Sequence, residues 1–372
     1  MRFTLVVWLC AIFSSIFPVT TVTDSVDALI ARHVAAVGGL ERINAIHSFA
    51  LHMRYTEGSY TSDHGYLAYM RPFYRIVGNP TLPINKDSIL EGYDGSSWEY
   101  YGDPGIVVRT IGPAAAATRH GAQRFIDRLY DYRSQGIHIV LLGHRKLSGV
   151  DELVLRETLR DGSSENVLLN AKSYLIDATE AIVPMHAFGD RLHLIELYSD
   201  YHPIGGVLFA YRNSEVDEST GKTLDSSLVL SVDTNLAYDK SYFSPPQIER
   251  TPLQSMIQRI YDERDSAVAV METYYDFHPI VAVNTQESAD AIDFVGYQCL
   301  KMGHAESAYR LLKANVAANP RYAPSHFGLG RVLDTEGKRA AAASEYRRAL
   351  ALDPGYARAK LALQALIRSP LK

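Results

Sequence analysis

The segment ADAIDFVGYQCLKMGHAESAYRLLKANVAANPRY (residues 289–322) contains the clearest structural pattern of the chain. It is followed directly by APSHFGLGRVLDTEGKRAAAASEYRRALALDPGY (residues 323–356). Landmark residues of the first segment recur in the second at one constant offset: Gly296 and Gly330, Gly303 and Gly337, Ala308 and Ala342, Leu312 and Tyr346, Pro320 and Pro354. A constant offset of about 34 residues indicates a stacked helix–turn–helix repeat.

The small residues and the proline explain this spacing physically. Gly330 is small where the two helices of one repeat are expected to cross closely, and Ala342 and Ala349 lie seven residues apart on one helix face. Pro354 ends the second helix because proline cannot continue the hydrogen-bond ladder. These residues resemble the tetratricopeptide repeat, which implies a groove lined from the first helix of each copy: Asp293, Tyr297, Lys301, Phe327, Arg331 and Asp334. Such a groove would bind a protein or an extended peptide, or would dock against the rest of the chain.

Further helices are predicted on both sides of the two repeats. Ala267 precedes Pro279 by the same interval as Ala342 precedes Pro354, which indicates a degenerate repeat at 253–279. Residues 357–368 are apolar at helical spacing and are expected to form a capping helix. Three prolines between residues 244 and 252 mark a linker, so the repeat domain is predicted to span 253–372.

Composition indicates a folded protein of about two domains. The chain has 372 residues, of which 47% are hydrophobic and 21% are charged. Its formal net charge is −5 and it has no long basic run. Neutralisation of phosphates requires clustered Lys and Arg, so we do not expect nucleic acid as a partner.

The first 23 residues have the order of a secretory signal peptide. Arg2 is the only charged side chain, a mostly apolar run extends from Phe3 to Phe17, and Pro18 precedes small polar residues. An uncleaved anchor and lipidation at Cys10 are the alternatives to cleavage. Cleavage would leave Cys299 as the single cysteine, which cannot form an internal disulfide. We therefore expect a protein of the bacterial cell envelope, periplasmic or secreted, for which peripheral contact with a membrane stays open.

Residues 24–243 predict an α+β domain that is mostly antiparallel. A helix is expected at 24–46, interrupted at Gly38-Gly39, and another at 113–131. Alternating patterns predict strands near 49–55, 65–77 and 98–100, followed by 137–143, 152–159, 164–169, 190–199, 206–214 and 227–237. Short connections between the strands favour an open β-barrel or curved sheet, and the helices would form a lid on one face.

Turn and strand markers in this domain carry a resemblance to a known family. They are Gly38-Gly39-Leu40, Arg71-Pro72, Tyr93-Asp94-Gly95 with Trp98, Asp161-Gly162, the run 174–179, the run 199–206, and Phe243-Ser244-Pro245. Over about residues 24–246 the chain resembles envelope domains related to the periplasmic outer-membrane lipoprotein carrier. The resemblance implies an unclosed β-barrel with a helical lid around an apolar cavity, and it transfers no catalytic residue.

Aromatic residues supply the candidates for a cavity wall. The chain has 24 tyrosines, many on predicted strands, where ordinary cross-strand packing is the alternative explanation. If the domain encloses a cavity for an amphiphile, we expect its wall to include Tyr66, Trp98, Tyr100, Phe125 and Leu129. The ligand would be a hydrophobic molecule or a lipidated protein.

No motif in the sequence indicates catalysis. There is no nucleophile elbow, no zinc-protease motif and no glycine-rich nucleotide loop, and the 13 histidines are scattered. We therefore expect no enzymatic activity, no cofactor and no metal. Two other hypotheses stay open: a scaffold or assembly factor that uses both domains for protein contacts, and an enzyme whose site the sequence does not reveal.

Overall fold

The computed structural model describes residues 25–85, 88–102, 104–185, 190–277, 279, 281 and 285–368. The predicted signal peptide at 1–23, with Cys10, lies outside these residues. In this described part, no helix is both long enough and apolar enough to cross a membrane.

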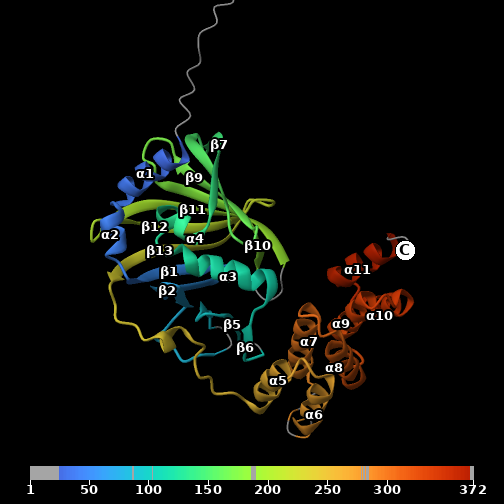
Figure 1. The fold of residues 1–372 in the computed structure, drawn as a ribbon. Coiled ribbons are helices and arrows are strands. Elements are labelled where there is room, and N and C mark those ends of the chain that lie inside the picture. The colour runs from blue at the N-terminus through green and yellow to red at the C-terminus, as the bar shows by residue number, and fades with distance from the viewer. Residues whose placement is uncertain are drawn as a thin grey trace, which may run out of the picture.

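One antiparallel sheet organises the N-terminal part (Figure 1). Thirteen strands of the described residues join it, in the order β6-β5-β4-β3-β2-β1-β13-β12-β11-β10-β9-β8-β7. The sheet is curved and does not close, and β1 and β13 pair at its middle. The strands are β1 Ser48–Glu57, β2 Tyr60–Met70, β3 Phe73–Val77, β4 Leu90–Tyr93, β5 Ser97–Tyr101, β6 Ile106–Arg109, β7 His138–Leu147, β8 Val150–Thr158, β9 Ser164–Asn170, β10 Ile176–Met185, β11 Asp190–Ile204, β12 Val207–Asp217 and β13 Lys222–Thr234.

The strand predictions differ from the structure at β2–β3 and at three strands that were not predicted, β4, β6 and β10. The single strand expected at 65–77 is wrong, because Arg71-Pro72 forms the turn of the hairpin β2–β3. Proline has no N–H for a ladder, which suits a turn better than a strand interior. The strand β10 was not predicted, since its sequence IDATEAIVPM lacks the alternation of apolar and polar residues that marks a half-buried strand.

Short helices cover the concave face of the sheet. They are α1 Val26–Val37, α2 Leu40–Asn44, α3 Gly112–Arg124, the 3-10 turn η1 Leu129–Asp131, and α4 Tyr132–Gln135. The expected helix at 113–131 is thus wrong beyond Arg124, because Phe125 has a φ of 49° and breaks the helix. Figure 1 shows α3 lying across the hollow of the sheet, where it contacts β3, β4, β5 and β10.

The glycine pairs of the resemblance meet in space. Gly38 ends α1 with a φ of 137°, and a Cβ placed on it would lie 2.2 Å from the carbonyl oxygen of Gly206 in the β11–β12 turn. Only glycine allows this approach. Apolar residues of α1, among them Leu29, Ile30 and Val37, pack on the sheet beside it and form its buried core.

The C-terminal part consists of antiparallel helices. They are α5 Pro252–Asp262, α6 Ala267–Phe277, α7 Gln286–Lys301, α8 Ala305–Ala318, α9 Ala323–Thr335, α10 Arg339–Leu352 and α11 Ala357–Arg368. The helices α8 and α10 begin at equivalent positions of the two predicted repeats, Ala305 and Arg339. Asn315 is fully buried where α10 has Ala349, and its amide donates to the carbonyl of Ala289 (3.0 Å) and to Ser325 (2.8 Å).

The helices are joined to the sheet at its edge strand β6. The side-chain amide of Gln258 accepts from the N–H of Val107 (2.8 Å) and donates to its carbonyl (3.2 Å), so α5 pairs with β6 as a neighbouring strand would. Ile106 and Val108, both fully buried, pack against Met256 and Ile260 of α5. This contact covers an edge that would otherwise be open to other strands.

Candidate functional site

A cavity of about 380 Å³ lies between the concave face of the sheet and a lid formed by α3, η1 and α4, residues 112–135. Its volume is within the range of small-molecule sites. One wall is apolar and comes from α1, β1–β3, β12, β13 and the lid: Val37, Phe49, Leu51, Met53, Leu67, Ile76, Phe125, Ile126, Leu129, Phe209 and Val229. Phe49 lies at its centre, with ring centroids 5.1 Å from Phe125 and 5.4 Å from Phe209.

The lid after α3 is shaped by Asp127. Its carboxylate accepts from the backbone N–H groups of Leu129 (2.8 Å) and Tyr130 (3.3 Å), which folds the chain back over the cavity. Its other oxygen is 3.3 Å from Nε2 of His33 on α1. Nδ1 of the same ring is 2.7 Å from the carbonyl oxygen of Tyr174. Both ring nitrogens of His33 therefore face acceptors, an arrangement that suits the doubly protonated imidazolium.

The pKa values of this pair follow from the geometry. Burial alone would lower the pKa of His33, but the charge and hydrogen bond of Asp127 raise it above its ordinary value of 6.5. Burial would likewise raise the pKa of Asp127, and His33 lowers it below 3.8. The buried pair thus joins α1 to the lid through opposite charges.

Two lid arginines bind the polar wall of the cavity. Nε of Arg128 is 2.9 Å from Glu157 on β8, and its side chain also contacts Glu165 on β9. Arg124 is 2.6 Å from Glu165 and 2.6 Å from Glu196 on β11. Burial would raise the pKa of Glu165, but the two arginines lower it to about 2. The lid is therefore held to the sheet by charge pairs along one side and by apolar contacts along the other.

The far end of the cavity is acidic. Glu215 on β12 lies directly opposite Asp225 on β13, and burial together with this neighbour raises the pKa of Glu215 well above 4.5. A carboxyl group that keeps its proton can donate a hydrogen bond to a ligand. In the described residues, no group of three or more His, Cys, Asp or Glu side chains is placed to hold a metal ion.

The structure separates the five residues predicted for the cavity wall. Phe125 and Leu129 line the cavity, whereas Tyr66, Trp98 and Tyr100 are not among its lining residues. The latter pack in a different cluster, with Val77 and Leu90, and the indole N–H of Trp98 donates to the carbonyl of Phe243 (2.8 Å). Their placement in the cavity is wrong because side chains alternate along a strand, and these three point to the opposite face.

The charged wall was not predicted from the sequence, although a signal for it exists. In β8, Leu153, Leu155 and Glu157 occupy alternate positions, and all three are buried. A glutamate on the same strand face as two buried apolar residues is itself expected to be buried. Because a buried charge is costly when unpaired, it needs a buried partner of opposite charge. The sequence does not show which basic residue supplies it, because Arg128 is 29 residues away.

The residues predicted for the repeat groove come partly together. The guanidinium of Arg331 lies 6.0 Å from the ring centroid of Tyr297 and 5.8 Å from that of Phe327, and Lys301 lies 5.4 Å from Tyr297. Phe327, however, is buried in the helical core, where it packs against Tyr346. Burial and the nearby Asp334 raise the pKa of Tyr346 to about 12.

Asp293 is the unusual member of this groove. Its Oδ1 is buried and has no hydrogen-bond partner in the described part of the chain. It lies where α7 meets α9 closely, since a Cβ on Gly328 would be 2.7 Å from it. Burial, followed by the charge of Asp290, raises the pKa of Asp293 to about 7.

Comparisons with known proteins concern the fold. No protein-family model and no curated protein matches the chain. A DUF1329 family protein from Desulfovibrio piger is 12% identical, with 59% of this chain and 98% of that chain covered at a TM-score of 0.36. A LolA superfamily protein from Nitrosomonas europaea is 13% identical, with 58% of this chain and 96% of that chain covered at a TM-score of 0.38. A putative outer membrane lipoprotein-sorting protein domain from Vibrio parahaemolyticus is 14% identical, with 57% of this chain and 95% of that chain covered at a TM-score of 0.33. At such low TM-scores, none of these likenesses bears on what this chain binds.

Proposed function

We propose that the protein is a non-enzymatic binding protein of the bacterial cell envelope, which holds a hydrophobic or amphiphilic ligand in the cavity under its lid. The observation that supports this most directly is the cavity of about 380 Å³ with one apolar, aromatic wall. Leu51, Leu67 and Ile76 are only half-buried because they face this space. An amphiphile would complete their burial and gain about 25 cal/mol for each Å² of apolar surface removed from water.

The way the lid is held also supports a ligand carrier. Ion pairs from Arg124 and Arg128 fasten it to the polar wall. Such pairs can be exchanged for water when the lid opens, whereas a continuous apolar core would resist opening. Entry of a ligand would therefore require the lid to separate from β8, β9 and β11, with the sheet unchanged.

The helical part is assigned to a protein or peptide partner in this proposal. We take it as a short tetratricopeptide-type module whose groove includes Tyr297, Arg331 and Asp293. The alternative, a scaffold in which both parts make only protein contacts, predicts a cavity that stays empty.

The test is purification of the exported full chain under native conditions, followed by solvent extraction and mass spectrometry. We expect a stoichiometric lipid or acyl species. A Leu67→Trp variant fills the cavity and should carry none, while Leu230→Trp, at an exposed position on β13, should carry as much as the wild type. A wild-type protein that is empty and also fails to take up a fluorescent fatty acid would overturn the proposal in favour of the scaffold.

A further inference from the structure

Carboxylates lie in register across four neighbouring strands at one end of the cavity. Glu196 on β11 is directly opposite Glu215 on β12. Asp225 on β13 is opposite Glu215, and Glu57 on β1 is opposite Asp225. Residues directly opposite each other point to the same face of a sheet, and like charges in such positions are destabilising. Glu196 and Glu215 line the cavity, so this carboxylate row lies on the concave face and requires protons or cations that offset its charge.

The basic side chains of the cavity do not offset all of its acidic groups. Among the described residues that line it, the basic ones are Arg124, Arg128 and His33, and each is already engaged in the ion pairs of the lid. The same lining includes six carboxyl groups, an excess of three over the basic side chains: Glu91, Asp127, Glu157, Glu165, Glu196 and Glu215.

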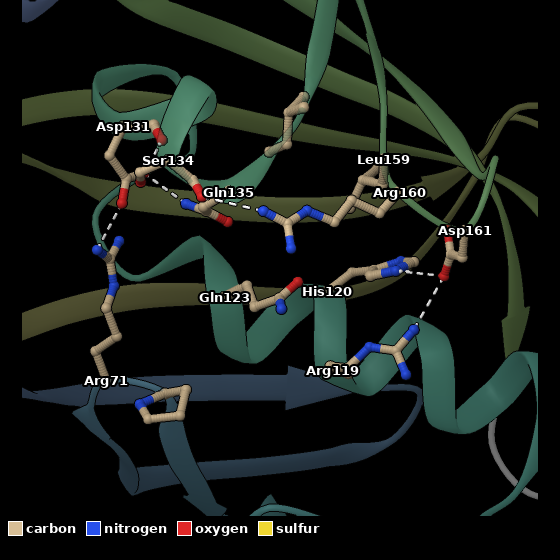
Figure 2. Close-up of a pocket in the computed structure, with 12 residues that line it drawn as sticks. Arg71, Arg119, His120, Gln123, Asp131, Ser134, Gln135, Leu159, Arg160 and Asp161 are labelled. Carbon is tan, nitrogen blue, oxygen red and sulfur yellow. Dashed lines mark hydrogen bonds and ion pairs between the residues drawn. The ribbon is translucent and has the colours of Figure 1, made fainter.

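Three further arginines near the lid line a different space. Successive residues of a helix are rotated by about 100°, so α3 turns Arg124 toward the cavity and Arg119 away from it. Arg119 lines a surface pocket together with Arg71 and Arg160, and Figure 2 shows it beside Asp161, its partner in an ion pair of 3.0 Å. No described residue lines both this pocket and the cavity, so these arginines are not in the wall that a ligand in the cavity would contact.

Glu215 lies among acidic neighbours from three strands. Burial raises its pKa, and the charges of Asp225 on β13, Glu196 on β11 and Glu91 on β4 raise it further. Glu91 accepts from the hydroxyl of Tyr74 (3.4 Å), whose ring also lines the cavity. The faces of aromatic rings attract cations. A cation beside Glu215 would therefore replace the proton that this carboxyl group otherwise keeps.

The carboxylate row extends from the cavity to solvent. Glu57, at the end of β1, is exposed, and its Oε2 accepts from the hydroxyl of Tyr55 (3.0 Å). A cleft lined by charges of one sign raises the local concentration of ligands of the opposite sign. The row would thus attract a cationic ligand toward the cavity and repel an anionic one.

We propose that the ligand of the cavity is a cationic amphiphile, with its ammonium group beside Glu215 and its hydrocarbon chain against the apolar wall around Phe49. This inference rests on the function proposed above. An ammonium group supplies several N–H donors, and its hydrogen bonds to carboxylates are stronger than those between neutral groups. An anionic head group would add to the acidic excess of the cavity, and an uncharged hydroxyl would leave that excess in place.

The test is calorimetric titration of the full chain at pH 7 with dodecylammonium, dodecanol and dodecanoate, each below its micellar concentration. The three probes have the same chain and differ in the charge of the head group. We expect dodecylammonium to bind about tenfold more tightly than dodecanol or better, because it adds charge-assisted hydrogen bonds. Dodecanoate should bind more weakly than dodecanol.

A pair of variants locates the head group. Glu215→Gln keeps the shape of the side chain and removes its charge, so the preference for dodecylammonium over dodecanol should fall by about fivefold or more. Glu218→Gln, directly after β12, changes a 53% exposed side chain outside the cavity lining and should keep the preference. Circular dichroism shows whether both variants fold. A folded Glu215→Gln protein with the full preference would overturn the placement of the ammonium group.

The other outcomes separate this inference from the proposed function. If the wild type binds dodecanoate as tightly as dodecylammonium, the cationic head group is overturned and the lipid-binding function stands. A native ligand with an anionic head group would have the same consequence. If no probe binds and native extraction yields no ligand, both proposals fail. Propylammonium distinguishes the source of the cation: binding as tight as that of dodecylammonium would overturn the amphiphile in favour of a small soluble amine.

Discussion

Arg128 of the lid and Glu157 of strand β8 form an ion pair of 2.9 Å in which the two side chains are 2% and 1% exposed. Arg128 also donates to the carbonyl of His120 on α3 (3.3 Å). The desolvation of two buried charges is costly, and only their mutual attraction and hydrogen bonds offset it. Loss of either side chain alone would leave the other charge buried and uncompensated.

Loss of this arginine should destabilise the protein strongly. In Arg128→Met, Glu157 keeps its burial but loses its partner, so we expect the free energy of unfolding to fall by about 3–5 kcal/mol. Urea denaturation followed by circular dichroism would measure the change. Arg133→Met removes a pair with Asp27 whose side chains are 71% and 60% exposed, and should change stability little. Similar effects of the two substitutions would contradict the buried character of the first pair.

His33 should make stability depend on pH. Its pKa in the folded state is raised above 6.5, so the stabilisation from its charged form is complete below pH 6.5 and is lost as the pH rises through the folded pKa. Asp127, the partner, has a lowered pKa and stays ionised over this range. We expect the unfolding free energy of the wild type to fall above pH 6.5 relative to His33→Gln. Parallel pH profiles for the two proteins would show that the pair with Asp127 carries no such linkage.

Trp98 should behave as a core residue and not as a ligand contact. It is fully buried and bonded to the carbonyl of Phe243, so Trp98→Ala should lower the free energy of unfolding by about 3–5 kcal/mol. Leu67→Ala, on the cavity wall, should cost less because its surroundings are already incompletely packed. Trp98→Phe should keep the lipid content found by extraction. Loss of lipid from a folded Trp98→Phe protein would instead indicate that Trp98 contacts the ligand.

Asp293 should weaken the helical part as the pH rises. Burial raises its pKa from 3.8 to about 7, so the fold favours the neutral form, and this contribution is present below pH 3.8 and lost on the way to pH 7. Asp293→Asn removes this loss, and we expect it to be more stable than the wild type at pH 8, by thermal unfolding. Asp265→Asn, with an 82% exposed side chain, is the control. If Asp293→Asn and the wild type had the same melting temperature at every pH, the raised pKa of Asp293 would be refuted.

Elements whose signals are local could be predicted from the sequence. The recurring landmarks of the two repeats placed the turns between α7 and α8 and between α9 and α10. Gly303 and Gly337 mark these turns because each has a positive φ, which favours glycine. Alternation placed β1 and most later strands, and turn residues showed that the sheet is antiparallel. Such signals depend on neighbours within a few residues of one another, which one chain displays directly.

The residues that line the cavity could not be predicted without the tertiary structure. The fold of the lid placed Phe125 over the cavity, whereas the register of β5 turned Trp98 to the opposite face of the sheet, although both are aromatic residues of the same domain. It also paired Arg128 with Glu157, 29 residues away, and brought Arg71 and Arg160 from two separate turns to one pocket. The face of a sheet and the partner of a buried charge depend on register and long-range packing, which no local pattern of residues encodes.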